Sequence, residues 1–167
     1  LYDLTSLQRD GNRLFGYTAQ QVLDYAQALY EKKLLTYPRT DSNYLTEDTA
    51  ATVPELLEQS VSSLPFSVEV GPTDVSRVVD ASKVSDHHAL LPTMQVKQDA
   101  LAALPAGERN ILTLVIVRLL CAVSGKQVYE DTAVVLDCGG TSFFAKGRVV
   151  TIPGWKAVEQ AFLSTLK

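Results

Sequence analysis

The run from Ile111 to Val123 constrains the fold more than any other stretch of this sequence. It is apolar apart from Thr113 and Arg118. A helix needs about 20 apolar residues to cross a bilayer, and this run is shorter and carries a charge. We therefore expect a helix buried in a protein core, around which the other elements pack.

The residues that follow this helix change from helical to alternating periodicity. β-Branched and alternating residues at 128–138 and 141–150 flank Gly139-Gly140, a dipeptide that favours a tight hairpin turn. Pro153-Gly154 ends the second strand, and Trp155 begins a last helix. Because the character of the sequence changes near Pro105, we expect two units, residues 1–104 and 105–167.

The first part of the chain predicts two capped helices. Leu4–Phe15 has near-helical apolar spacing and is followed by Gly16, a typical C-cap residue. Thr18 and Gln21 then form a capping-box pattern ahead of a second amphipathic helix. The arrangement is similar to a helix-turn-helix opening.

The middle of the chain predicts shorter elements. Thr46 starts a helical stretch, and Pro54 either kinks it or begins a new turn, because proline lacks a backbone donor. Residues 60–72 are rich in Ser and Pro and predict a loop, and Val75–Val79 predicts a short strand. The expected fold class is α+β, with a mainly helical first part and then a hairpin and a helix.

Composition excludes several classes of protein. Of the 167 residues, 46% are hydrophobic and 20% are charged, which predicts a folded domain rather than a disordered chain. Cys121 and Cys138 form neither a disulfide framework nor a metal-ligand pattern. No secretory leader is recognisable, so we expect a reducing, cytoplasmic setting and no membrane. The formal charge of −4 disfavours a protein that coats DNA by bulk electrostatic attraction.

The segment from Thr36 to Ser42 holds the first candidate for chemistry. A tyrosine has a pKa of about 10 and becomes a nucleophile only where the phenolate, or the charge on its target, is stabilised. Arg39 is two residues from Tyr37, and in an extended segment both side chains would lie on one face. A guanidinium matches two phosphate oxygens in shape and can hold a phosphodiester for attack. Spacing alone, however, favours the simpler interpretation of a packed tyrosine near Pro38.

The segment from Ser85 to Thr93 holds the second candidate, because the chain's two histidines are adjacent there. Neighbouring side chains point apart in an extended segment, so either His87 or His88 can face a site. A histidine can donate to a phosphate or carry a proton. A bond to a local carbonyl explains the pattern equally well, and adjacency without a nearby cluster of cysteines or carboxylates argues against zinc.

Taken together, these motifs resemble one protein family. LYE at 29–31, LTYPRTDS at 35–42 and SDHHALLPT at 85–93 are similar to the central region of type IA DNA topoisomerases, closest to the bacterial topoisomerase III-like branch. SLQRD at 6–10, NRLFG at 12–16, GRVV at 147–150 and PGW at 153–155 resemble the same family, in the same order. The resemblance covers nearly the whole chain.

The resemblance implies an isomerase that cleaves DNA. Tyr37 would be the nucleophile, joined to the 5′ phosphate of a single strand, with strand passage and resealing that need no ATP. Arg39 would hold the scissile phosphate, and His87 would support its geometry. Supporting contacts to DNA are expected from Gln8, Thr40, Asp41 and Ser42. The implied fold is a winged-helix (CAP-like) tyrosine domain at 1–104, followed by part of a β-rich gate domain.

One departure from the family pattern concerns the cofactor. The acidic Asp-x-Asp-x-Glu-Gly-type signature through which relatives bind Mg²⁺ does not occur in this sequence. No metal is therefore expected on this chain, and Mg²⁺ is expected only through the acidic domain of a full-length enzyme. The chain would then be an excised piece, inactive by itself, of an enzyme that works at the nucleoid.

Two other interpretations stay open. A non-catalytic winged-helix DNA-binding module would need a basic recognition helix, yet Lys32 and Lys33 stand only at the end of the second helix, offset by Asp24 and Glu31. A protein-interaction domain would explain the composition but would leave the tyrosine, arginine and histidine motifs without a purpose.

Overall fold

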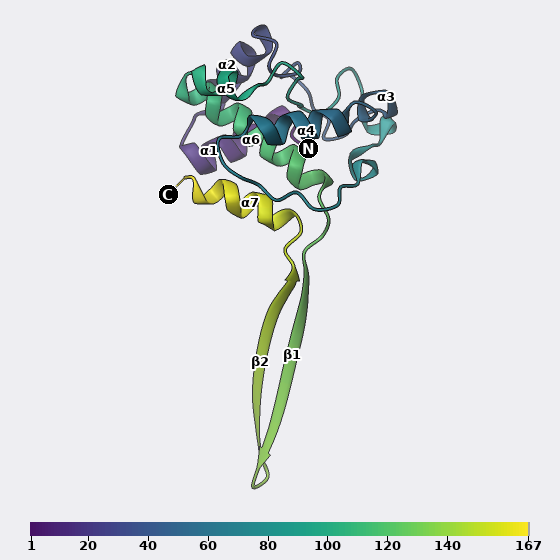
Figure 1. Ribbon diagram of the computed structural model, residues 1–167, viewed down its shortest axis with the longest axis vertical. Helices are drawn as coiled ribbons and strands as arrows, with labels where there is room; N and C mark the ends of the chain where they lie inside the picture. Colours follow the sequence, from purple (N-terminus) through teal and green to yellow (C-terminus); the bar gives the residue numbers. More distant parts are fainter. Residues whose placement is uncertain (167) are drawn as a thin grey trace.

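The computed structural model describes residues 1–166, which form a helical body and one long β-hairpin that projects from it (Figure 1). In chain order the elements are α1 (Leu4–Phe15), α2 (Ala19–Glu31), α3 (Glu47–Ala50), α4 (Val53–Ser63), the 3₁₀ helices η1 (Val75–Val78) and η2 (Ala81–Lys83), α5 (Gln98–Ala103), α6 (Ala106–Val123), β1 (Val128–Cys138), β2 (Thr141–Ile152) and α7 (Trp155–Ser164). The α+β fold class, with helices first and then a hairpin and a helix, is confirmed.

Helix α6 is the axis of the body, as the apolar run predicts. It packs against α1, α2 and α7, and Ile111, Ile116 and Leu119 on it have no exposed surface. A helix that contacts neighbours on several sides can be apolar nearly all round, since no stripe is left for water. The buried cluster also takes in residues from both sides of Pro105. The division of the chain near that residue stays a prediction.

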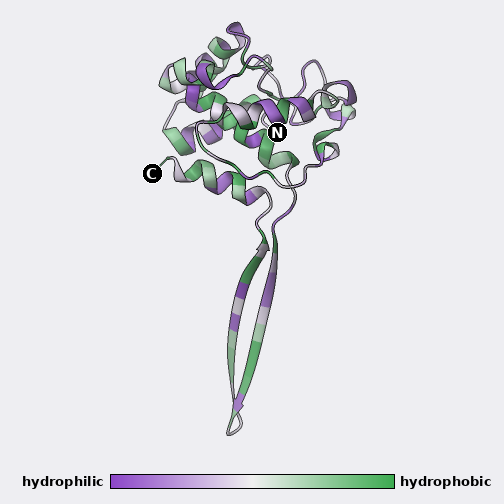
Figure 2. Cartoon of the chain, viewed as in Figure 1, coloured by the Kyte–Doolittle hydropathy of each residue, from purple (hydrophilic) through white to green (hydrophobic). Residues whose placement is uncertain are grey.

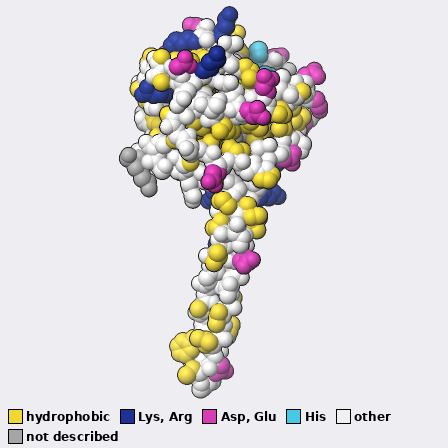
Figure 3. All heavy atoms as spheres, in the orientation of Figure 1, with side chains coloured by type: hydrophobic (Ala, Val, Ile, Leu, Met, Phe, Trp, Pro, Cys, Tyr) yellow, Lys and Arg dark blue, Asp and Glu magenta, His cyan; other side chains and the backbone are white. Residues whose placement is uncertain are grey.

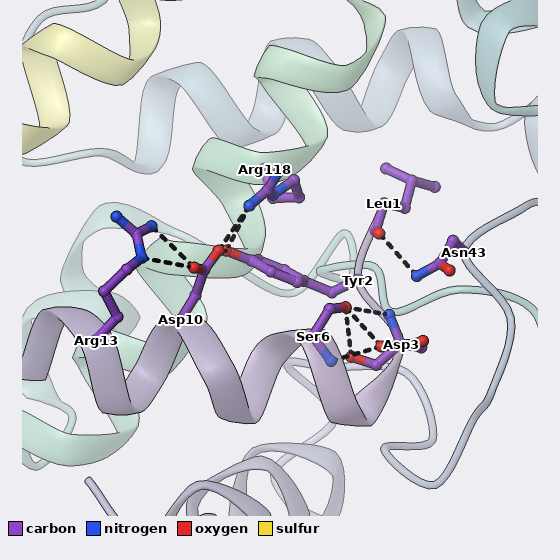
Figure 4. A network of polar contacts seen from close by, with 8 residues as sticks. All are labelled: Leu1, Tyr2, Asp3, Ser6, Asp10, Arg13, Asn43 and Arg118. Carbon is purple, nitrogen blue, oxygen red and sulfur yellow. Dashed lines mark hydrogen bonds and ion pairs between the residues drawn. The ribbon is translucent and has the colours of Figure 1, made fainter. Parts of the chain in front are cut away.

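The one charge within the run, Arg118, belongs to a polar network between α6 and the start of the chain (Figure 4). Its guanidinium donates to Asp10 Oδ2 at 2.6 Å and to the Tyr2 hydroxyl at 3.2 Å, and the Tyr2 hydroxyl donates to Asp10 at 2.6 Å. Burial, reinforced by the hydrogen bond to Asp10, raises the pKa of Tyr2. Burial alone would raise the pKa of Asp10, but hydrogen bonds from Tyr2 and Arg13 outweigh it, and that pKa lies below its ordinary value. The network therefore favours the ionised form of the Asp10 side chain at the edge of the core.

The caps predicted for the first two helices are confirmed. Gly16 ends α1 in the left-handed conformation, with φ of 70°. Thr18 Oγ1 accepts from the Gln21 backbone at 3.2 Å, and Gln21 Oε1 accepts from the Thr18 backbone at 2.9 Å. Two amides at the start of α2, those of Thr18 and Gln21, are thereby satisfied.

In the middle of the chain the structure differs from two expectations. Helix α4 begins at Val53 with Pro54 in its first turn and continues to Ser63, so the predicted loop starts later than residue 60. The Ser63 hydroxyl donates to the Ser60 carbonyl at 2.8 Å, which lets serines serve at the end of a helix. The strand predicted at Val75–Val79 is wrong, because Asp74 caps a 3₁₀ helix there and only Val79 forms an isolated bridge. Thr46 does cap a helix, the short α3.

The hairpin confirms the predicted turn, and β2 extends to Ile152. Gly139 and Gly140 have φ of 61° and 83°, the positive values that a type I′ turn requires at both positions. The strands pair antiparallel, with Val135 opposite Phe144. Every residue of both strands is exposed, including many apolar ones (Figure 2). The hairpin therefore adds no residue to the core.

After the hairpin the chain returns to the body through Gly154. Its φ is 55°, and a Cβ there would lie 2.5 Å from the backbone of Lys126. The Trp155 amide donates to Gly125 O at 2.9 Å, so the two ends of the hairpin are held together. Helix α7 then packs on α6, with Val158 and Phe162 buried. Within residues 1–166 no helix combines the length and hydropathy that a bilayer crossing requires.

Candidate functional site

The tyrosine and histidine motifs, far apart in sequence, lie beside each other in the body. After α2, residues 34–36 pair with residues 91–93. The Thr36 amide donates to Leu91 O at 3.0 Å, the Leu91 amide donates to Thr36 Oγ1 at 2.9 Å, and the Thr93 amide donates to Leu34 O at 3.1 Å. These bonds bring the two motifs together.

Tyr37 is half-buried and lies against His87. The ring centroids are 4.6 Å apart, and Tyr30 contacts Tyr37 from another side, edge to face, at 5.4 Å. Among the described residues, the Tyr37 hydroxyl forms no hydrogen bond. It lines a hollow of about 570 Å³, which is large enough for a small ligand or part of a strand. The phenol is thus held by ring contacts while its oxygen stays accessible.

Arg39 is exposed and lines a second hollow, of about 440 Å³, beside the first turn of α1. The chain bends at Pro38, and the Thr40 amide donates to Pro38 O at 3.1 Å. Because the segment is bent, the expectation that Tyr37 and Arg39 share one face is not met. The two hollows adjoin at Ser85, Asp86 and His87, which line both. His87 therefore lines both the hollow of Tyr37 and the hollow of Arg39.

Thr40, Asp41 and Ser42 connect the tyrosine loop to the histidine loop. The Thr40 hydroxyl donates to His87 O at 2.9 Å, and the Ser42 hydroxyl donates to Lys83 O at 2.8 Å. Both side chains are buried. Asp41 is exposed and accepts a longer bond, 3.4 Å, from the Ser85 hydroxyl. These bonds fix the position of His87 relative to Tyr37.

Gln8 lies apart from both hollows, whereas His88 lines the hollow of Tyr37. The Gln8 amide donates to Ala19 O at 3.0 Å and joins α1 to the start of α2, and Gln8 lines neither hollow. His88 Nδ1 donates to Ala89 O at 2.7 Å, so that ring nitrogen is engaged by a local carbonyl. His88 thus forms the bond to a local carbonyl that one of the two interpretations expects, and the roles of both histidines stay predictions.

Sequence reasoning missed two residues that share the hollow with Tyr37. Tyr30, near the end of α2, is 42% exposed, and Lys33 has φ of 60°. Both line the hollow. The signal was present in the sequence, because an LYE segment shortly before the tyrosine motif places an aromatic ring within a helical turn or two of it.

Charge and metal-ligating groups are distributed unequally over the body. Lys and Arg side chains gather at the end of the body opposite the hairpin, where histidine atoms are also visible (Figure 3). Among residues 1–166, no three His, Cys, Asp or Glu side chains gather in a way that could hold a metal ion. The described residues therefore do not fit a magnesium site.

Comparison with known proteins gives consistent matches. The family described as DNA topoisomerase matches residues 1–164. The chain is 42% identical to DNA topoisomerase 3 of Bacillus licheniformis and 41% identical to that of Bacillus subtilis, over 165 residues in each case. These alignments cover 95% of this chain, and the chain spans 22% of the length of each relative.

A solved structure shares the fold. Full-length topoisomerase I from Thermotoga maritima superposes with a TM-score of 0.60 over 96% of this chain and 26% of that chain, at 21% identity. The family match, the relatives and the shared fold agree with one another. The chain belongs to the type IA DNA topoisomerase family.

Proposed function

We propose that this chain supplies the strand-cleaving tyrosine of a type IA DNA topoisomerase, with single-stranded DNA as the segment that is cut. The observation that carries the proposal is the contact between Tyr37 and His87, whose ring centroids are 4.6 Å apart on the wall of an open hollow. The phenol oxygen is free of hydrogen bonds to the described residues, so a phosphodiester can approach it. Ring contacts from Tyr30 and His87 limit the directions from which attack can occur.

The proposed reaction is a reversible exchange of esters. Tyr37 Oη attacks the phosphorus, and the phenol loses its proton as the new P–O bond forms. The bond from phosphorus to the 3′ oxygen breaks, and that oxygen takes up a proton to become a hydroxyl. The strand then ends in a 5′-phosphotyrosine ester. Because one phosphate ester replaces another, the reverse attack by the 3′ hydroxyl reseals the strand without ATP after strand passage.

Arg39 and His87 would act on the phosphate rather than on the tyrosine alone. Arg39 carries a permanent charge and can neutralise the charge that develops on the non-bridging oxygens. The two hollows adjoin at His87, so a strand that runs from one to the other would place a phosphate beside the imidazole. Thr40, Asp41 and Ser42 would serve mainly by fixing these loops, and Gln8 would contact DNA only outside the hollows.

Magnesium would come from outside this chain. We propose that an acidic domain of the complete enzyme binds Mg²⁺ and completes the site opposite Tyr37, so that no step described above runs through the metal. The complete enzyme would act on DNA in the cytoplasm, at the nucleoid.

The alternative of a non-catalytic DNA-binding module needs basic residues that are free to meet DNA along a recognition helix. Lys32, at the end of α2, instead forms an ion pair with Glu108 of α6 at 2.5 Å. Within its bounds α2 has no Lys or Arg, and one of the two cations that follow it is paired with a carboxylate of the protein, which supports the catalytic proposal over this alternative.

A chimera tests the proposed function. We would replace the matching segment of Bacillus subtilis DNA topoisomerase 3 with this chain, incubate the chimera with a labelled single-stranded oligonucleotide, and trap covalent complexes with denaturant. The chimera should form an adduct, and the Tyr37→Phe variant should form none. Tyr44→Phe, in the same region of the chain, is the matched control and should retain the adduct. An adduct that persists with Tyr37→Phe would show that another residue is the nucleophile.

A further inference from the structure

Lys33 adopts a backbone conformation that normally belongs to glycine. It is the one non-glycine residue with positive φ in the described part of the chain, and it follows Lys32, the C-cap residue of α2. Its amide donates to Tyr30 O at 2.9 Å, the next amide donates to Leu29 O at 2.9 Å, and Thr93 Oγ1 donates to Lys33 O at 2.6 Å. Glycine takes this helix-ending conformation without steric cost, whereas a side chain makes it strained. Strained backbone conformations cluster at functional sites, and Lys33 lies at the edge of the hollow that holds Tyr37.

The side chains of Lys33 and Tyr30 line the same hollow as Tyr37. Lys33 is exposed and forms no ion pair with a described residue, in contrast to its neighbour Lys32, which is bound to Glu108. Tyr30 is 42% exposed although its ring contacts Tyr37. The hollow thus offers a free cation and an accessible aromatic ring beside the candidate nucleophile.

These two groups match the two parts of a nucleotide. An ammonium group binds a phosphate as a point charge, and an aromatic ring stacks on a base whatever its identity. Stacking of this kind is the usual way in which proteins bind single strands, whose bases are not paired. Asp86 also lines the hollow and would repel a phosphate, which places the phosphate at the Lys33 end.

We propose that Tyr30 and Lys33 form a subsite for one nucleotide of single-stranded DNA, next to the nucleotide whose phosphate Tyr37 attacks. Tyr30 stacks on the base and Lys33 binds the adjoining phosphate, so the strand is held in place before the bond is cut. This inference rests on the proposed function, because it concerns the same strand.

Binding of a fluorescein-labelled single-stranded oligonucleotide of roughly 12 nucleotides to the 167-residue chain tests the subsite, with fluorescence anisotropy measured over a range of salt concentrations. Tyr30→Ala should weaken binding about tenfold, since a stacked base is lost. Tyr30→Phe keeps the ring and should bind as the parent chain does. Tyr30→Leu keeps apolar volume without an aromatic face and should resemble Tyr30→Ala, which separates stacking from packing.

Lys33→Gly should weaken oligonucleotide binding without lowering thermal stability. The variant should be at least as resistant to thermal unfolding as the parent chain, because glycine fits the positive φ. It should nevertheless bind the oligonucleotide several-fold more weakly, and the slope of log K against log salt should fall by about 0.7, as expected for one lost phosphate contact. Lys97→Gln, an exposed lysine outside the hollow, is the charge-matched control and should leave affinity and slope unchanged.

Several outcomes would overturn the subsite. These are no binding by the parent chain, equal weakening by Lys97→Gln and Lys33→Gly, or unchanged affinity in Tyr30→Ala. Equal losses on a duplex of the same sequence would show bulk attraction rather than a single-strand site. Failure of the proposed function has a different signature, because it is decided by the covalent adduct of Tyr37→Phe in the chimera. The subsite variants leave the nucleophile in place.

Discussion

The helical body and the hairpin use similar apolar residues with opposite results. On α6, Ile116 and Leu119 are fully buried, whereas on the hairpin Val135 is 62% exposed and Phe144 is 74% exposed. The helix meets neighbours on several sides, while the two strands pair only with each other and leave both faces and both edges to solvent within the described chain. Apolar content therefore does not decide burial, because burial depends on whether another surface is available to cover the element.

The two regions differ in their ion pairs as well. In the body, Arg118 donates to Asp10 at 2.6 Å, and on the hairpin Arg148 donates to Asp131 at the same distance. The Asp10 side chain is 16% exposed, and the Asp131 side chain is 56% exposed. The Arg148 pair is also bidentate, since Nη2 donates to Asp131 Oδ2 at 2.8 Å, yet we expect it to stabilise less, because water screens the exposed pair.

The largest expected effect is the loss of core packing on α6. Leu119→Ala removes a fully buried side chain and should lower the free energy of unfolding by roughly 3–4 kcal/mol, from lost burial and the cavity left behind. Leu136→Ala on the hairpin, where the side chain is 60% exposed, should change it by less than about 0.5 kcal/mol. Urea unfolding of both variants measures the difference. Equal losses would break the contrast and show that the hairpin packs on something in solution.

The next effect lies at the junction between the two regions. Gly154→Ala places a Cβ 2.5 Å from the Lys126 backbone at a positive φ, so the main chain must shift. We expect a loss of about 3 kcal/mol. Gly147→Ala, within β2, meets no atom within 4 Å and should leave stability nearly unchanged. Thermal unfolding distinguishes them, and a harmless Gly154→Ala would mean that the return to α7 is less tightly built than the contacts indicate.

The contribution of Asp10 to the stability of the body should depend on pH. Asp10→Asn removes a charge from the Arg118 network and should cost about 1.5 kcal/mol near neutral pH. The pKa of Asp10 is lowered in the folded state, so its contribution is complete above the unfolded value near 4 and is lost as pH falls through the folded value. The stability gap between parent and variant should therefore close in acid. Asp80→Asn, which removes a pair with Lys83 that is more open to water, is the comparison variant and should show a smaller gap, although hydrogen bonds from Ser82 and Lys83 lower the pKa of Asp80 as well. A gap that persists in acid would contradict the charge-based account.

The smallest effect is expected on the hairpin itself. Arg148→Gln breaks the exposed pair with Asp131 and the contact of the guanidinium with the Tyr129 ring at 3.8 Å. The melting temperature of the body should not change measurably, while amide exchange should become faster in β1 and β2. Hydrogen exchange followed by mass spectrometry separates the two regions. Faster exchange in the body of this variant as well would mean that hairpin and core are coupled.

The candidate site was predicted in its parts but not in its arrangement. Tyr37, Arg39 and His87 follow from motifs in the sequence, and the structure places Tyr37 against His87. The separation of Arg39 into an adjoining hollow was not predicted, because it results from the bend at Pro38 and the bond from Thr40 to His87 O. The place of Lys33 at the hollow was not predicted from the sequence, for a similar reason. Its positive φ depends on how α2 ends and on Thr93, which lies far along the chain.

Local signals in the sequence determined the elements. The capping box of Thr18 and Gln21, the turn at Gly139-Gly140 and the buried helix at Ile111–Val123 each depend on residues close together in the chain, whose interactions are nearly independent of the rest of the fold. Only the tertiary structure decided that the tyrosine and histidine loops meet, that two hollows rather than one lie around them, and that the apolar residues of the hairpin stay exposed. The physical reason is that these features depend on which surfaces meet across long stretches of chain, and that meeting is set by packing rather than by local propensity.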